Sequence, residues 1–580
     1  MGAKAGGCKI AVTSRTKSLT SAILTATSWA LWAFALITIK TSGLRLGAYG
    51  LAGSLPPFFY AACVALSLAF ILNLATPRVD QWRDALFVCQ IALLVAFLFV
   101  TPALIEPFPR FRTTYKVVGL TYLVIGGGAV NPAASILFNW PGAWALFSSV
   151  FQVALPSPDT LSVFVKYYAP LIEAAYGLAL YVLFRPFLSK KQTYLALFLF
   201  YSMNYVGQDY FSPQSVAYLL FLAFLALTFI YIIRPSSTTM RYPTVTISSL
   251  LFIIFLSLVV THFLTSFALL LFVIVFAVSS RIVEKVRLTR FIVPYVVGFA
   301  GWMLFGSAAY FNYMLNRQAA TPVSESLSQG IQAGVTGGNP SGAVGSVSHA
   351  FIANVGILWA IAVAGVVSIW FIYRYASLRK LDKTEAAFLA LLVGIVPLLL
   401  LPGYGGELLF RGFLLALPAL LYYFVKNASF RSVKIAVVLI LLAGPILHVV
   451  VAYGNESFNY VSPSEISGYD FFYRTVANGS VFGGYPVAEY ANQQNYSSRN
   501  VLQFVSLVSA GPLNASIQSN LLRAGASYIF FTSGDDAIIR TLYAPRVNEY
   551  QNAKNVVANA TYFNLIYSSA DVVLYQVRPA

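Results

Sequence analysis

Long apolar runs separated by short polar stretches recur along the chain from Ser18 to Val451. A helix needs about 20 apolar residues to cross the roughly 30 Å hydrocarbon core of a bilayer, and most of these runs reach or approach that length. The pattern predicts thirteen spans, at residues 18–39, 54–75, 85–105, 166–184, 192–206, 213–233, 244–261, 264–280, 291–310, 350–373, 385–402, 408–425 and 434–452. The first run is long and has no clear small-residue cleavage site, so we interpret it as a span and not as a cleavable signal peptide.

The pattern changes after Val451 to that of a small folded domain. "ASYIFFT" and "ADVVLYQV" have the composition of strands, and "IQSNLLRAGA" that of a helix. We therefore predict an all-α polytopic membrane domain, residues 1–452, followed by a small α/β domain, residues 453–580. The Asp535–Asp536 pair follows a Ser-Gly turn, which is more typical of a helix cap than of a site.

Two outer regions interrupt the spans, at 106–165 and 311–349. The first contains "FNWPGAWALFSSVFQV", residues 138–153, which we interpret as a helix on the outer surface, with Trp140 and Trp144 at headgroup level. The second is rich in Gly, Ser, Ala and Gln, which predicts a flexible loop that serves as a lid or as slack.

Charge placement indicates how the chain is oriented. The chain is 58% hydrophobic and 10% charged, with a net charge of +18. Most Lys and Arg residues lie in the predicted inner loops, for example Arg185, Lys190 and Lys191, which is the positive-inside bias of plasma-membrane proteins. The basic excess thus reports topology, with the N-terminus cytoplasmic and the C-terminal domain extracellular. It points to membrane lipid as a partner and away from nucleic acid.

Glycosylation sequons agree with this orientation. Asn-x-Ser/Thr occurs at Asn455, Asn478, Asn495, Asn514 and Asn559, all after the last predicted span. A further sequon at Asn427 falls in a predicted inner loop and is interpreted as chance. The three cysteines (Cys8, Cys63, Cys89) all precede the C-terminal domain, so that domain has no disulfide and depends on its own core.

Ionisable residues gather at the outer ends of the predicted spans. They are Glu106, Asp209, His262, Glu407 and Arg411. Charges at hydrocarbon depth are costly and default to a functional interpretation. Each also has a simpler explanation: His262 as an interfacial histidine in a tight turn, Asp209 as a helix cap, and Glu407 with Arg411 as a structural ion pair. Their common location predicts one polar cavity that opens outward.

The residue types suit transfer from a lipid-phosphate donor. Glu106 or Asp209 can act as a general base toward an acceptor hydroxyl. Arg411 can hold a phosphate through its fork, with Glu407 one helical turn away to orient it, and His262 can donate a hydrogen bond. Arg110 and Arg112 in the first outer loop are further cations that we assign to substrate binding.

Several segments also resemble a known superfamily. "NYVGQDYFSPQSVAYLLF", "THFLTSFALLL", "YGGELLFRGFLLALP", "FNWPGAWAL" and "GNESFNYVSPSEI" are similar to segments of uncharacterised prokaryotic, and more specifically archaeal, membrane proteins of the GT-C glycosyltransferase superfamily. The resemblance covers roughly residues 85–475. It implies a many-helix bundle with outer loops over the active site and polyprenyl-phosphate-linked sugars as donors.

One departure from the superfamily concerns the first outer loop, where members often carry an acidic pair that acts as base or binds a metal. This chain offers Glu106 alone, with Thr113, Thr114 and Lys116 where a relative has Asp and His. Either Glu106 or Asp209 then serves as base, or the chain has lost transfer activity. The resemblance leaves the cofactor open, including a divalent metal such as Mg²⁺ or Mn²⁺, and no residue is assigned as a metal ligand.

The leading hypothesis is a glycosyltransferase that modifies a surface glycan, glycolipid or glycoprotein at the outer face. A transporter or flippase for a lipid-linked substrate is one alternative, and it would show inverted repeats and broken helices at mid-depth. A non-catalytic scaffold of the cell envelope is the other, favoured by the missing acidic pair. The polar residues at one face favour the transferase.

Overall fold

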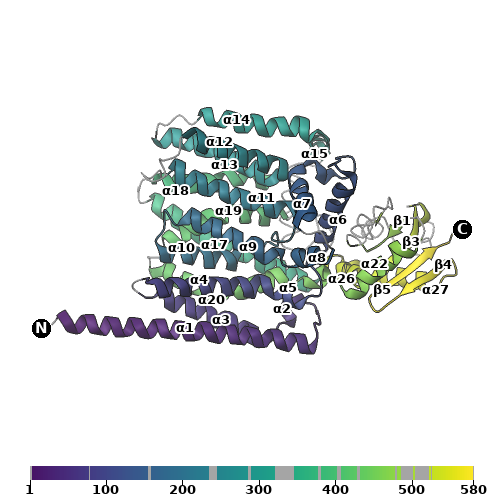
Figure 1. Cartoon of the computed structure of the whole chain (residues 1–580), viewed down its shortest axis with the longest axis horizontal. Coiled ribbons are helices and arrows are strands. Elements are labelled where there is room, and N and C mark those ends of the chain that lie inside the picture. The colour runs from purple at the N-terminus through teal and green to yellow at the C-terminus, as the bar shows by residue number, and fades with distance from the viewer. Residues whose placement is uncertain are drawn as a thin grey trace.

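The computed structural model describes residues 3–76, 79–154, 158–233, 244–284, 289–320, 345–376, 381–400, 407–427, 431–476, 480–484, 487, 501–502, 521–523 and 525–578. Long helices lie side by side in a bundle, and a domain that contains strands packs against one end of it (Figure 1). The chain is therefore a polytopic helical membrane protein with a C-terminal α/β domain.

Each of the thirteen predicted spans coincides with a helix or with a helix and its continuation. They are α1 (Ala3–Ser42), α3 (Pro57–Leu74), α4 (Gln81–Val95) with η1 (Ala96–Val100) and α5 (Thr101–Ile105), α9 (Tyr168–Phe184), α10 (Lys190–Met203), α11 (Pro213–Thr228) with η3 (Phe229–Ile233), α12 (Thr244–Thr261), α13 (Phe263–Glu284), α14 (Thr289–Gly301) with η5 (Trp302–Gly306), α17 (Val347–Ala376), α18 (Lys383–Ile395) with η6 (Val396–Leu400), α19 (Glu407–Lys426) and α20 (Arg431–Tyr453).

Within the described residues, seven of these helices are long and apolar enough to span a membrane, and four shorter apolar helices accompany them. α18 and α10 are in neither group, and α10 has only 14 residues and begins with polar ones. Its residues from Thr193 to Met203 are all buried, so α10 is an interior helix enclosed by others. α1, in contrast, lies at the edge of the bundle. Its apolar side chains Leu19, Trp29 and Ile37 are more than half exposed, on a face suited to contact lipid.

Short helices cover the end of the bundle next to the C-terminal domain. They are α2 (Gly50–Ser54), α6 (Arg112–Gly127), η2 (Ile136–Asn139), α7 (Pro141–Ala154), α8 (Pro158–Lys166) and α15 (Ala308–Ala320), and α6, α7, α8 and α15 are seen there in Figure 1. The segment expected as a surface helix is η2 followed by α7. Trp140 and Trp144 are buried within the protein and not exposed on its surface. The Trp144 indole donates to the Leu137 carbonyl at 3.1 Å, which satisfies its N–H inside the fold. Of the second outer loop, residues 321–344 lie outside the described ranges.

The C-terminal domain is built on a mixed five-stranded sheet in the order β2-β1-β3-β5-β4. The strands are β1 (Ser480–Phe482), β2 (Val501–Leu502), β3 (Ala526–Thr532), β4 (Phe563–Ser568) and β5 (Val572–Val577). β1 pairs in parallel with β2 and β3, whereas β5 pairs antiparallel with β3 and β4. β3 and β5 confirm the two strands predicted from composition. Of "IQSNLLRAGA", residues 521–523 are helical, while residues 517–520 and 524 lie outside the described residues.

Alternation along β3 gives the sheet two cores. Ile529 and Phe531 face the helices α26 (Ser533–Leu542) and α27 (Val547–Asn559), joined by η7 (Ala544–Arg546). Tyr528 and Phe530 face α22 (Pro463–Thr475), which follows the short helix α21 (Glu456–Asn459). Tyr115 of α6 belongs to this second core, so the membrane domain contributes a side chain to the interior of the C-terminal domain.

Candidate functional site

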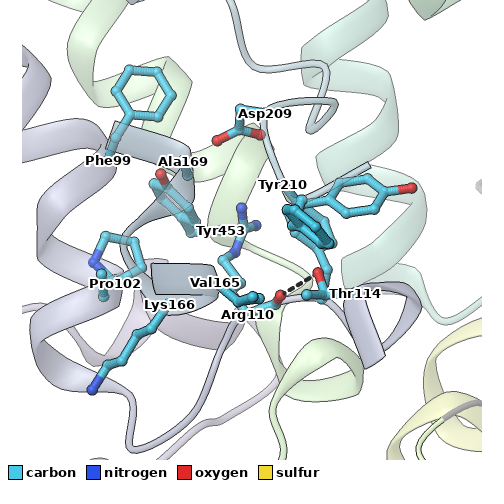
Figure 2. Close-up of a pocket in the computed structure, with 13 residues that line it drawn as sticks. Phe99, Pro102, Arg110, Thr114, Val165, Lys166, Ala169, Asp209, Tyr210 and Tyr453 are labelled. Atoms are coloured by element: carbon cyan, nitrogen blue, oxygen red, sulfur yellow. Dashed lines mark hydrogen bonds between the residues drawn. The ribbon is translucent and has the colours of Figure 1, made fainter. Parts of the chain in front are cut away.

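A pocket with three charged residues in a largely apolar lining lies at the end of the bundle next to the C-terminal domain. It encloses about 390 Å³ of space, counting its open mouth, and is lined by Phe99, Pro102, Ala103, Arg110, Phe111, Thr114, Val165, Lys166, Ala169, Asp209, Tyr210, Phe211 and Tyr453 (Figure 2). We call it the Arg110 pocket. Its charged lining residues within the described chain are one carboxylate, Asp209, and two cations, Arg110 and Lys166.

The wall formed by α4, η1 and α5 owes its shape to Pro102. Proline has no N–H for the carbonyl four residues earlier, that of Leu98. The helix widens into a π-turn at η1 just before this proline. The hydroxyl of Tyr453, at the end of α20, donates to the Leu98 carbonyl and so satisfies the orphaned acceptor. Such π-turns are frequent at functional sites.

Arg110 is anchored from behind by the segment that follows the last span. Its Nε donates to the Glu456 carboxylate and its Nη2 to the Ala452 carbonyl. Its guanidinium carbon lies 4.3 Å from the centre of the Tyr453 ring, a cation–π arrangement. Figure 2 shows the guanidinium directed toward Asp209. A cation held in this way is preorganised to meet an anion in the pocket.

Asp209 is carried by the loop between α10 and α11. Ser212 caps α11 by accepting from the Ser215 N–H at 3.3 Å, so Asp209 is not the helix cap that its position in the sequence also allowed. Phe211 anchors the loop, with its ring 4.1 Å from that of Phe147. Gly207 adopts a φ of +67°, which a residue with a side chain rarely does. The carboxylate is therefore placed at the pocket by a loop fixed on both sides.

Burial and neighbouring charges shift the ionisation of these groups. Burial raises the pKa of Asp209, and the positive charge of Arg110 opposes that rise. Burial likewise raises the pKa of Glu106, reinforced by Glu456 and opposed by Arg110 and Lys166. Burial lowers the pKa of Lys166, which Glu106 partly offsets. The cluster thus combines three carboxyls, those of Asp209, Glu106 and Glu456, with two cations, so the negative charge of the carboxylates is only partly offset.

The two candidate bases differ in their access to the pocket. Glu106 ends α5 and is only 2% exposed, and among described residues it is not part of the pocket lining. Its Oε1 has no hydrogen-bond donor within the described chain. Asp209 lines the pocket and faces Arg110. Of the two, Asp209 is the carboxylate that a pocket ligand can reach.

Arg112 points away from the Arg110 pocket, toward the C-terminal domain. Its Nη1 and Nη2 donate to the two oxygens of Glu465 at 2.7 and 2.6 Å. Its Nε donates to the Phe458 carbonyl at 3.0 Å, and Nη2 also to that of Tyr460 at 3.1 Å. The arginine that the sequence suggested for substrate binding is thus engaged between the two domains.

His262 and Arg411 form a second group of sequence-predicted residues. The Nδ1 atom of His262 lies 3.0 Å from the Thr265 hydroxyl, at the turn between α12 and α13. Burial lowers the pKa of His262 to about 3, and the positive charge of Arg411 adds to that effect. Glu407 begins α19, but its side chain is outside the described part of the structure. The lining of the Arg110 pocket, as far as the chain is described, includes neither His262 nor Arg411.

A divalent metal does not fit the carboxylates present. Within the described residues, no group of three or more His, Cys, Asp or Glu side chains converges as a ligand set. Glu456 forms an ion pair with Arg110. The positive charge of Arg110 also acts on Asp209 and Glu106, so these carboxylates already have a cation close to them. We therefore derive no step through a metal.

The sequons fall in different surroundings. Asn559 ends α27 and is exposed, whereas Asn455 is half-buried just after α20. Asn478, Asn495 and Asn514 lie outside the described residues. Asn427, interpreted as a chance sequon, is 3% exposed and its amide donates to the Tyr423 carbonyl.

Sequence reasoning missed three residues of this site: Lys166, Tyr453 and Glu456. Lys166 is the first residue of the predicted span 166–184, and it was not assigned to a site. Glu456 lies in the quoted segment "GNESFNYVSPSEI", directly after the last apolar run, and a carboxylate in that position is itself a signal. Its partner Arg110 is 346 residues earlier, so the pairing is not readable from local pattern.

Solved structures of two other proteins are similar to this chain. The Archaeoglobus fulgidus oligosaccharyltransferase, in a complex with Zn and sulfate, has a TM-score of 0.49 at 11% identity, covering 85% of this chain and 73% of that chain. ArnT from Cupriavidus metallidurans, bound to undecaprenyl phosphate, has a TM-score of 0.44 at 11% identity, covering 85% and 97%. No family model and no curated protein matches the chain. The likeness concerns the arrangement of helices, and no residue's role is transferred from it.

Proposed function

We propose that the chain is a membrane glycosyltransferase that takes a sugar from a polyprenyl-phosphate-linked donor and transfers it to a surface glycan, glycolipid or glycoprotein. The observation that carries this proposal is the pairing of Asp209 with Arg110 and Lys166 in one pocket at the end of the membrane bundle. A base beside two cations suits transfer from a phosphate-linked sugar, because the base can accept the acceptor's proton and the cations can stabilise the departing phosphate. The reaction would take place on the outer face, beneath the extracellular C-terminal domain.

Asp209 is the proposed general base. Burial raises its pKa and Arg110 restrains the rise, and a carboxylate with a raised pKa is a stronger base than an exposed one. It accepts the proton of the acceptor hydroxyl as that oxygen forms a bond to the anomeric carbon of the donor sugar. The bond from that carbon to the phosphate oxygen breaks, and its electron pair leaves with the phosphate.

Arg110 and Lys166 are the proposed partners of the departing phosphate. Arg110 presents a planar fork and Lys166 a mobile point charge, and both counter the negative charge that grows on the leaving oxygen. Arg411, His262 and Glu407 remain proposed donor-binding residues on the neighbouring helices. Glu106 and Arg112 take supporting roles, Glu106 through its charge near Lys166 and Arg112 through its hold on the C-terminal domain.

An apolar cavity adjoins the Arg110 pocket and shares Thr114 and Val165 with it. Its other lining residues include Phe108, Val118, Leu161 and, from the C-terminal domain, Ile466. We assign this cavity to the apolar part of a substrate next to the reacting phosphate. Undecaprenyl phosphate, the ligand held by the ArnT structure, is a lipid carrier of the kind that the proposed donor would leave behind once its sugar is transferred.

Transfer of radiolabelled sugar from polyprenyl-phosphate donors, in membranes that contain the full chain, is the direct test. Asp209→Asn should lower the rate by about 10²-fold or more, because it removes the base and leaves the shape unchanged. Asp470→Asn is the matched control, since that carboxylate is 56% exposed on α22 and is not among the residues that line the pocket. Unchanged transfer by the Asp209 variant would overturn the assignment. Uptake or flipping of donor without transfer would favour the transporter.

A further inference from the structure

Three consecutive residues, Arg110, Phe111 and Arg112, reach three different parts of the molecule. Arg110 meets the end of α20 and Glu456 at the pocket. The Phe111 ring lies against the loop that carries Asp209, with its centre 5.0 Å from that of Tyr210. Arg112 meets the C-terminal domain through Glu465. The pocket cation, the pocket base and the C-terminal domain are thus joined through one tripeptide.

The middle residue of this tripeptide is held in an unfavourable backbone conformation. Phe111 has a φ of +67° and is the only non-glycine residue with a positive φ in the described chain. A bulky residue adopts this region only where its surroundings enforce it, and such residues cluster at functional sites. The two arginine anchors supply that enforcement, and the phenyl ring fills the space beside Gly207, where a Cβ would come within 3.2 Å of it.

Arg112 is the anchor on the side of the C-terminal domain. Its side chain is buried, and the bidentate pair with Glu465 joins residues 353 apart in the chain. The guanidinium also packs on Gly534 at the first turn of α26, where an added Cβ would lie 1.5 Å from Nη2. One side chain therefore contacts both α22 and α26 from the membrane domain.

We propose that Arg112 is a positioning residue: by locking the C-terminal domain through Glu465 and Gly534, it holds Phe111 and thereby sets Arg110 and the Asp209 loop in the pocket. The pocket lining, within the described residues, takes no side chain from the sheet of the C-terminal domain. That domain nevertheless governs phosphate binding through this link. The proposal rests on the proposed function only for the nature of the ligand.

Hydrogen exchange of the full chain in detergent tests the link without any ligand. Arg112→Gln should raise exchange in residues 107–115 and also in the loop 204–212, which Arg112 does not itself contact. Arg474→Gln is the matched control, because it breaks an exposed pair with Asp470 on α22 and should leave both segments unchanged. If only the C-terminal domain loosens while 204–212 stays protected, Arg112 is a docking contact and the proposal fails.

Gly534→Ala provides a second route to the same perturbation. The new Cβ should displace the Arg112 guanidinium from Glu465 and raise exchange in 204–212. In an Arg112→Gln background the same substitution should add no further change there, since the atoms it would strike are gone. An equal effect of Gly534→Ala in both backgrounds would overturn the proposal, because the change would then act within α26 alone.

Binding of undecaprenyl phosphate, followed by native mass spectrometry, supplies the functional readout. We expect Arg112→Gln to weaken binding by about tenfold, a typical coupling between sites, and Arg474→Gln to leave it unchanged. Equal binding by both variants would show that Arg112 does not set the phosphate site. If the unmodified chain does not bind this probe, the proposed donor class fails, while the exchange experiment still decides whether Arg112 positions the pocket.

Discussion

The hydroxyl of Tyr453, at the end of the last span, donates to the carbonyl of Leu98 in the third, which Pro102 leaves without a helical donor. This bond fixes the Tyr453 ring beneath the guanidinium of Arg110. A break in one helix thereby shapes the pocket, because the group that repairs it also supports the pocket cation.

Removing that hydroxyl should cost stability while the pocket keeps its shape. Tyr453→Phe leaves the Leu98 carbonyl buried without a donor, at a cost of about 1–3 kcal/mol, and retains the ring under Arg110. The melting temperature of the purified chain should fall. Tyr49→Phe is the control, because Tyr49 is 48% exposed and keeps its ring contact with Phe351. An unchanged melting temperature in Tyr453→Phe would mean that the carbonyl has another donor.

The charge of Arg110 should set the acidic limb of the pH–rate profile. Asp209 acts as a base only when ionised, so the rate falls as the pH drops through its pKa. Arg110 keeps that pKa lower than burial alone would. Its removal should therefore move the limb to higher pH. Because Arg110→Gln alone strands Glu456, the comparison is between Glu456→Gln and the double variant Arg110→Gln/Glu456→Gln.

Arg110→Lys completes that comparison. Lysine retains the charge and loses the fork, so the limb should stay in place while the affinity for a phosphate donor falls. A limb that moves with Arg110→Lys as far as with the double variant would show that geometry, and not charge, controls Asp209.

A close approach inside the bundle makes Gly177 hard to replace. A Cβ at this position would lie 1.9 Å from the Tyr201 hydroxyl, which donates to the Glu173 carbonyl at 2.9 Å. Gly177→Ala should displace Tyr201 and destabilise the chain by roughly 1–3 kcal/mol. Gly365→Ala is the control, since no atom lies within 4 Å of its Cβ and alanine favours a helix. Thermal unfolding should separate the two, and equal melting temperatures would contradict the close approach.

The helices of the bundle could be predicted from sequence because hydrocarbon imposes the same requirement on every span. α10 shows how far the pattern reaches, since even this short buried helix was found. The π-turn at η1 was not predicted, although Pro102 near the end of a span signals an orphaned carbonyl. Its repair by Tyr453 depends on a contact 355 residues away.

The sequence indicated which end of the spans holds the candidate site, but not which residues contact one another there. Asp209 and Arg110 line the same pocket, and Arg411 lies close enough to affect His262. Arg110 and Arg112 looked equivalent in the sequence, yet they point to different partners. Phe111 between them has a φ of +67°, an unusual backbone conformation that the residue types do not predict.

Ionisation of Asp535 should lower the stability of the C-terminal domain as the pH rises. Burial raises its pKa to about 6 from an ordinary 3.8, with Arg112 opposing the rise. The folded state thus binds the proton more tightly than the unfolded state does. The resulting stabilisation is complete below pH 3.8 and is lost as the pH rises through about 6; it amounts to about 3 kcal/mol.

Asp535→Asn should abolish this pH dependence. One carboxylate oxygen accepts from the Gly484 N–H and the Thr532 hydroxyl at 2.8 and 2.9 Å, and an amide oxygen can accept both. The variant should match the unmodified chain near pH 4 and exceed it near pH 7.5. Exchange of the β3 amides in the full chain measures the difference, and Asp470→Asn is the control. A constant difference at both pH values would mean that the change acts through packing.

The orientation of the bundle remains a prediction that two engineered cysteines can test. Asn559 is exposed on α27 of the C-terminal domain. Lys383 is exposed at the start of α18, next to Asp382, which pairs with Lys426 at the end of α19 opposite to Arg411. The two positions thus mark opposite ends of the bundle.

In a chain with Cys8, Cys63 and Cys89 replaced by alanine, a maleimide that cannot cross membranes should label Asn559→Cys in intact cells and label Lys383→Cys only after lysis. The reverse result would place the Arg110 pocket on the cytoplasmic side. It would also exclude glycosylation at Asn559 and make Asn427, although 3% exposed, the sequon on the outer side. Mass spectrometry of the two peptides checks the same point, because a glycan is expected on the peptide with Asn559 and not on the peptide with Asn427.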